Sequence, residues 1–243
     1  MIAVTIVGRV ALEALFPSLT LQGVGLVLNW VFVALVVGLV AWLGWWEKIR
    51  LVAPVNRRAL IYVLPFVVMV FVPLAFGLAI PEISLVEGTT LPPWAAVVVI
   101  VVGVAFGAAV AEELLFRGVL LRALEPHGRV LAVVLPSVVF GLSHISQVIL
   151  GNSLADWLPQ MIIIIPLSVG LGALALRLES LWPLVLWHFA VDVTGGLAAN
   201  PSALMELVTI GLIFVVFVLG IGLLWHDRKV LRPRAPVEAE VSA

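Results

Sequence analysis

The stretch Ala111–Arg122, which reads AEELLFRGVLLR, places two carboxylates and an arginine at the end of a long apolar run. The residues before it, 93–110, carry no charged side chain and are numerous enough to enter a bilayer. Ionisable side chains at membrane depth are costly, so they indicate a functional site. A structural ion pair, or a helix end that returns to water, would give the same pattern, and this stretch alone does not decide between them.

The spacing within this stretch predicts different environments for the two carboxylates. Glu113 and Arg117 are four residues apart, and a glutamate four residues before an arginine is in the favourable order for an ion pair on a helix. Glu112 projects about 100° away from Glu113 around the helix axis. We therefore expect the arginine to hold one carboxylate while the other faces something else.

The composition is that of a membrane protein. The 243 residues are 63% hydrophobic and only 11% charged, with a mean hydropathy of +1.26. Soluble domains of this size do not need so many apolar residues, so we predict an all-α polytopic membrane protein that forms a single domain over residues 1–243. The absence of cysteine excludes disulfides, thiolate metal ligands and a cysteine nucleophile.

The apolar segments predict about seven transmembrane helices. They cover residues 24–46, 59–80, 93–121, 130–150, 157–176, 181–199 and 204–225. The N-terminal segment 2–16 is short for a span and contains Arg9 and Glu13, so we expect an interfacial or half-inserted helix, which would be an eighth span if it crosses. The polar tail 226–243 is expected to be cytoplasmic and disordered.

The charges of the loops predict the orientation. In the seven-span arrangement the lysines and arginines of the loops lie on one side, in residues 47–58, 122–129, 177–180 and 226–234. The opposite loops carry Glu82, Glu87, Asp156 and Glu206 and no basic residue. Basic loops favour the cytoplasm, so we expect a cytoplasmic C-terminus and the inner membrane of a prokaryote.

Few ionisable side chains lie inside the predicted spans, and all of them fall on three spans. They are Glu112, Glu113, Arg117, His144, His188 and Asp192. In lipid such residues need partners, and convergence in one cavity supplies them. We therefore expect a core of four helices, the third to sixth spans, around a polar cavity that opens toward the cytoplasm.

These residue types favour hydrolysis. A carboxylate and an imidazole that share one water form a general base, and a second imidazole can stabilise an oxyanion or protonate the leaving amine. His188 and Asp192, four residues apart, can fix one imidazole tautomer or place two ligands on one metal. The same set could bind Zn²⁺, and the sequence does not choose between the two mechanisms.

Three motifs in this order resemble those of the CPBP intramembrane proteases, also called the ABI family, which include the type II CAAX prenyl endopeptidases. They stand here as Glu112-Glu113-Leu-Leu-Phe-Arg117, Phe140-Gly-Leu-Ser-His144 and His188-Phe-Ala-Val-Asp192, within residues 93–200. The resemblance implies that Glu112 activates water together with His144, that Glu113 and Arg117 support them, and that His188 and the residue four positions on face the oxyanion.

The last motif departs from the family pattern, because Asp192 stands where the CAAX proteases tend to have asparagine. An aspartate donates to an oxyanion only when it is protonated, so we expect Asp192 to orient His188 or carry a proton.

We therefore expect an intramembrane endopeptidase, of glutamate or metallo type, that acts on a peptide or a protein substrate, prenylated or not. The glutamate mechanism needs no cofactor, and the metallo mechanism would use Zn²⁺. The bilayer is the expected surrounding partner, and no nucleic acid is expected. The alternatives are a transporter that relays protons or metal ions and a non-catalytic immunity or scaffold protein.

Overall fold

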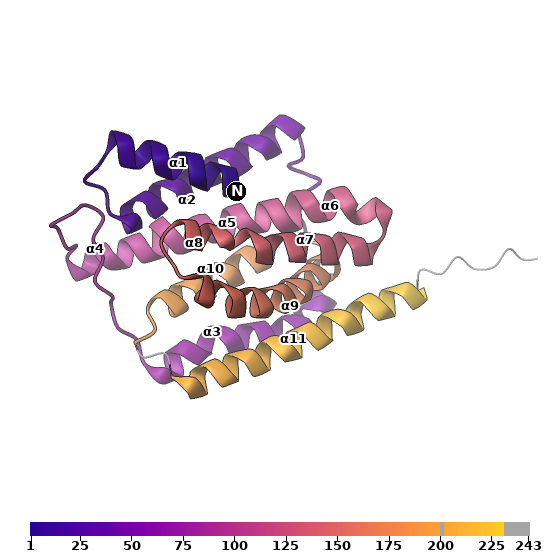
Figure 1. Cartoon of the computed structure of the whole chain (residues 1–243). Helices are drawn as coiled ribbons and strands as arrows, with labels where there is room; N and C mark the ends of the chain where they lie inside the picture. The colour runs from indigo at the N-terminus through magenta and orange to yellow at the C-terminus, as the bar shows by residue number, and fades with distance from the viewer. Residues whose placement is uncertain (200–201, 231–243) are drawn as a thin grey trace, which may run out of the picture.

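In the computed structural model, which describes residues 1–199 and 202–230, the chain is a bundle of helices that lie nearly side by side (Figure 1). Helices α1 and α2 form one edge of the bundle, and α3 and α11 form the opposite edge. The described residues contain no strand, only two isolated bridges, Leu19 with Val86 and Leu78 with Ala198. The predicted all-α polytopic class is confirmed.

The helices follow the predicted spans closely, and the longest connections between them are residues 44–56 and 77–92. Their bounds are α1 Ile2–Leu15, α2 Leu21–Leu43, η1 Arg57–Val63, α3 Leu64–Phe76, α4 Pro93–Val98, η2 Val99–Phe106, α5 Gly107–Glu112, η3 Glu113–Leu120, α6 Leu121–Leu124, η4 Glu125–His127, α7 Arg129–Ser143, α8 Ile145–Ile149, α9 Leu154–Leu178, α10 Trp182–Gly196 and α11 Ala203–Val230. Of the predicted tail, residues up to 230 continue α11, and residues 231–243 lie outside the described part.

Within the described residues, six helices are long and apolar enough to cross a membrane. They cover Leu21–Leu43, Arg57–Phe76, Pro93–His127, Arg129–Ile149, Trp157–Leu178 and Ala203–His226. The remaining predicted span, 181–199, is α10, which has only 15 residues. At about 1.5 Å per residue it is shorter than the hydrocarbon core of a bilayer.

Helix α10 is held inside the bundle. The indole of Trp187 donates to the Phe66 carbonyl of α3 at 2.6 Å, and the two rings meet edge to face. Helix α10 also packs against η2 and α5. The other helices therefore surround a segment too short to span the bilayer, and polar side chains on it can be kept from lipid.

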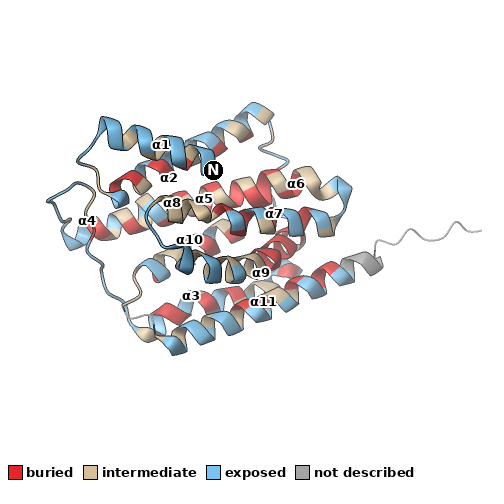
Figure 2. Ribbon diagram, viewed as in Figure 1, coloured by how far each residue is buried: buried red, intermediate tan, exposed pale blue. Residues whose placement is uncertain are grey.

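The outer faces of the bundle are apolar. Figure 2 shows buried residues gathered on the inner faces of the helices and exposed residues on the outer faces. Many exposed side chains are large and hydrophobic, among them Leu35, Phe71, Val98 and Phe214. Such an inverted surface is stable only against lipid.

Glycines bring α9 and α11 into close contact. A Cβ atom on Gly220 would lie 2.9 Å from the Gly170 Cα and 3.2 Å from the Val169 carbonyl oxygen. Small residues at such a contact let two helix backbones approach, which is a common source of helix association in membranes. Gly222, two residues on, has no atom within 4 Å of its Cβ position.

We predict that Gly220→Ala lowers the unfolding temperature in detergent whereas Gly222→Ala does not. Both substitutions gain helix propensity, but only the first forces α9 and α11 apart, at a cost of about 1–3 kcal/mol. Thermal unfolding of the two variants, measured side by side, checks this. Equal stability of the two variants would contradict the close packing of Gly220 on Gly170.

Candidate active site

The helix that carries the first motif changes its winding at the motif itself. Helix α5 ends at Glu112, and the π-helical segment η3 begins at Glu113 and includes Arg117. Both belong to the continuous helical run Pro93–His127. Segments of π-helix are rare and frequent at functional sites, since they shift side chains around the helix axis without breaking it.

The ion pair expected from the spacing is present and fully buried. Arg117 Nη1 donates to Glu113 Oε1 at 2.8 Å, and the exposed fractions of the two side chains are 2% and 0%. Arg117 Nη2 donates to the Ser168 hydroxyl of α9 at 2.9 Å. The guanidinium also lies over the Phe140 ring of α7, 4.7 Å from its centre. Arg117 thus ties three helices together.

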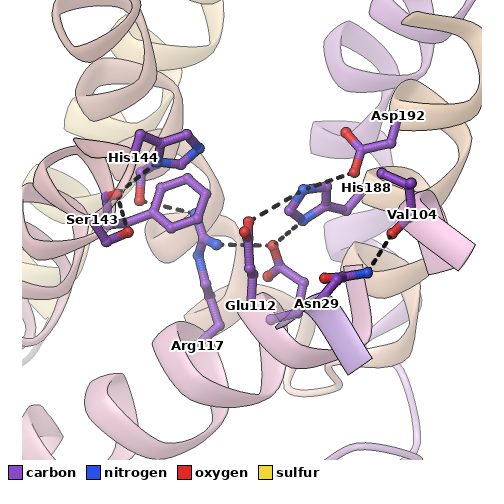
Figure 3. A network of polar contacts seen from close by, with 11 residues as sticks. Asn29, Val104, Glu112, Arg117, Ser143, His144, His188 and Asp192 are labelled. Carbon is purple, nitrogen blue, oxygen red and sulfur yellow. Dashed lines mark hydrogen bonds and ion pairs between the residues drawn. The ribbon is translucent and has the colours of Figure 1, made fainter. Parts of the chain in front are cut away.

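His188 of α10 lies among three carboxylates. Its Nδ1 donates to Glu113 Oε1 at 2.9 Å. Its Nε2 lies 3.5 Å from Asp192 Oδ2 and 3.7 Å from Glu112 Oε2, within ion-pair distance of both (Figure 3). Ionised carboxylates only accept hydrogen bonds, so a His188 ring protonated on both nitrogens matches all three neighbours.

His144 stands on the other side of Glu112. It lies between α7 and α8, and Figure 3 shows Glu112 between His144 and His188. His144 Nδ1 donates to the Phe140 carbonyl at 2.9 Å, as the spacing of four residues allows. Because a carbonyl can only accept, Nδ1 carries the hydrogen, and Nε2 remains an acceptor in the neutral ring. The Ser143 hydroxyl donates to the same Phe140 carbonyl at 2.6 Å.

A cavity of about 390 Å³ joins Glu112 and His144. Both side chains line it, together with apolar residues such as Phe32 and Val104. Five of the predicted site residues, Glu112, Glu113, Arg117, His188 and Asp192, are in direct contact, and His144 shares this cavity with Glu112.

The cavity extends away from the basic loops. The cavity is lined by the first turns of α2, from Gln22 to Asn29, and by Ile83 and Leu85 of the connection between α3 and α4. The basic residues Lys48 and Arg50 follow the other end of α2. The cavity therefore reaches from Glu112 and His144 to the end of the bundle that carries the acidic loops.

Sequence reasoning missed two polar residues, Ser168 and Asn29. Ser168 is one of several small residues of α9 and has no distinguishing spacing, so only the fold reveals its bond to Arg117. Asn29 is an amide in the middle of a 23-residue apolar helix. That feature could have been noticed, since a polar group at such depth is costly. Asn29 carries no charge, so a criterion based on ionisable side chains does not select it.

The predicted site residues are not arranged as a set of metal ligands. Among the residues that the structure describes, no group of three or more histidine, aspartate or glutamate side chains is arranged to hold a metal ion. Glu113 is bound to Arg117 and His188, and His144 Nδ1 is bound to a backbone carbonyl. We therefore derive no step through a metal.

Residues 92–194 match a family described as type II CAAX prenyl endopeptidase Rce1-like, which confirms the resemblance stated above. The matched segment begins just before α4 and ends inside α10, so it contains all six predicted site residues. No curated protein and no solved structure matches the chain.

We predict that Glu113→Ala strongly destabilises the protein whereas Glu13→Ala does not. Glu113 pairs with Arg117, four residues after it, and Glu13 pairs with Arg9, four residues before it, but the Glu13 side chain is 44% exposed. Removing Glu113 leaves the buried Arg117 uncompensated, at a cost of about 3–5 kcal/mol, against about 0–1 kcal/mol for an exposed pair. Thermal unfolding in detergent measures both. A Glu113→Ala protein as stable as Glu13→Ala would show that the buried pair does not support the fold.

Proposed function

Because residues 92–194 match the type II CAAX prenyl endopeptidase Rce1-like family, we propose that the protein is an intramembrane endopeptidase that hydrolyses a peptide bond with water activated by Glu112 and His144. The family supports a peptidase in general. The observation that carries the finer proposal is the shared cavity, which a carboxylate and an imidazole both line within an apolar bundle.

The proposed reaction begins with one water in this cavity. The water donates one hydrogen to Glu112 and the other to His144 Nε2, both of which are acceptors. Glu112 takes the proton as the water oxygen attacks the carbonyl carbon of the peptide bond. The C–N bond then breaks, and the amine leaves with a proton returned from the site.

His188 is the proposed donor to the developing oxyanion or to the leaving amine. Its Nε2 lies beside Glu112, and its Nδ1 is fixed by the hydrogen bond to Glu113. Asp192, 3.5 Å from Nε2, would orient the ring and favour its charged form in the transition state. Glu113, Arg117 and Ser168 would hold His188 and Glu112 in register without touching the substrate.

The substrate proposed from these features is a peptide associated with the membrane. The cavity lies among apolar walls and reaches the end of the bundle that carries the acidic loops, where we propose that it opens. With the basic loops in the cytoplasm, as the charge bias favours, this opening faces the opposite leaflet. A peptide inserted in or crossing the membrane fits this opening better than one presented from the cytoplasm.

We predict that Glu112→Gln abolishes cleavage while the protein remains folded. The substitution keeps the size of the side chain but removes the base, so the rate should fall by about 10²–10⁴-fold. Purified protein in detergent would be offered a pool of fluorogenic membrane-associated peptides, prenylated and unprenylated, with His144→Ala tested in parallel. Full activity of the Glu112→Gln variant would refute the proposed base. Full biological activity of that variant in cells would favour the scaffold or immunity alternative.

The metal question has its own experiment. We predict that a chelator leaves cleavage unchanged, since Glu112 and His144 suffice to activate water in the proposed mechanism. The same peptides are cleaved before and after treatment with chelator, and again after addition of Zn²⁺. Activity lost with chelator and restored by Zn²⁺ would establish a metallopeptidase instead.

A further inference from the structure

Asn29 is a polar residue of the cavity that lies outside the family segment. It belongs to α2, and it lines the same cavity as Glu112 and His144. The neighbouring positions on its helix are apolar: Leu28 is buried, and Trp30 is 39% exposed. A polar amide at this depth needs a reason beyond packing.

The amide of Asn29 is held rigidly against the helix that carries the site. Its Nδ2 donates to the carbonyls of Gly103 and Val104, at 2.9 and 3.2 Å, in the π-helical segment η2. The two helices approach so closely that a Cβ on Gly107 would lie 2.5 Å from this nitrogen. Gly107 begins α5, the helix that ends at Glu112, so Asn29 and Glu112 are fixed relative to one another.

These bonds also decide which way the amide faces. Both partners are carbonyls, which only accept, so the NH₂ group must be the part turned toward η2. The amide oxygen, Oδ1, is the part left, and none of the described residues donates to it. In Figure 3 this oxygen lies on the side of Glu112, away from Val104.

We propose that Asn29 Oδ1 positions the substrate by accepting a backbone N–H of an extended peptide that lies in the cavity beside Glu112. A peptide in this cavity meets mostly apolar walls, and a backbone N–H left there without an acceptor would be strongly unfavourable. An acceptor held by two hydrogen bonds costs little further ordering when the peptide binds. This inference rests on the proposed function, since it takes a peptide as the occupant.

The experiment is a binding cycle on protein that carries Glu112→Gln, so that the probe is not consumed. The probe is a fluorescent prenylated peptide, together with analogues in which one backbone amide at a time, near the cleaved bond, is replaced by an ester. We expect one ester to bind about 3- to 10-fold more weakly than the peptide, as the loss of one hydrogen bond implies. In the Asn29→Ala background that difference should disappear.

Gln22→Ala supplies the matched control. Gln22 is the other amide of α2 that lines the cavity, but its Oε1 already accepts from the Ser84 backbone N–H. The Gln22→Ala variant should therefore still bind the ester more weakly than the peptide. A purely structural role of Asn29 would weaken peptide and ester equally, and that result would overturn the proposal.

Cleavage by the unaltered protein separates this inference from the proposed function. Cleavage without any Asn29-dependent discrimination refutes the role of Asn29 and leaves the peptidase intact. Discrimination without cleavage by the unaltered protein supports Asn29 as a peptide-binding residue and refutes the peptidase. Binding of none of the peptides, prenylated or unprenylated, overturns the role of Asn29 as well.

Discussion

The carboxylate of Glu113, fully buried and bonded to both Arg117 and His188, is the interaction on which the rest of the site depends. Removing an ionised group from water is costly, and attraction between the partners offsets this only when their geometry is good. Here both bonds fall on one oxygen, Oε1, at 2.8 and 2.9 Å, while Oε2 is buried without a hydrogen-bond partner among the described residues. The arrangement is therefore not one that stability alone would favour.

What the pair provides is a fixed relation between helices. Arg117 reaches Ser168 of α9 and the Phe140 ring of α7, and Glu113 reaches His188 of α10. Within lipid there is little hydrophobic force to hold helices in one register, so polar contacts and close packing must do so. One buried ion pair thus sets the positions of the histidine on α10 and the phenylalanine on α7, whose carbonyl orients His144.

The sequence predicted the parts of this site that depend on helical spacing. Three pairs of residues are each four positions apart and in contact: Glu113 with Arg117, Phe140 with His144, and His188 with Asp192. The spans were also predictable, because long apolar segments with basic residues at their ends follow from the thickness and charge preference of the bilayer. Helix α10 is the exception in length, because a helix that is held within the bundle does not have to cross the whole bilayer.

The parts that spacing could not supply are contacts between distant segments. Nothing in the sequence indicates that Ser168 meets Arg117, or that Asn29 meets the carbonyls of η2. The direction in which the cavity extends could not be read from the sequence for a related reason. The end of the bundle that the cavity reaches depends on where neighbouring helices begin, and here the first turns of α2 and the connection after α3 form its wall.

The winding of the long helix, residues 93–127, explains how one segment both contacts Asn29 and carries the buried ion pair. It contains two π-helical stretches, Val99–Phe106 and Glu113–Leu120, on either side of the α-helical Gly107–Glu112. The first lies against the Asn29 amide, and the second carries the buried ion pair. Glu112 therefore ends a short α-helical segment that is held by the Asn29 amide before it and by the buried ion pair after it. A base that must stay next to one water cannot swing freely, and these contacts restrict its backbone while its side chain remains turned toward the cavity.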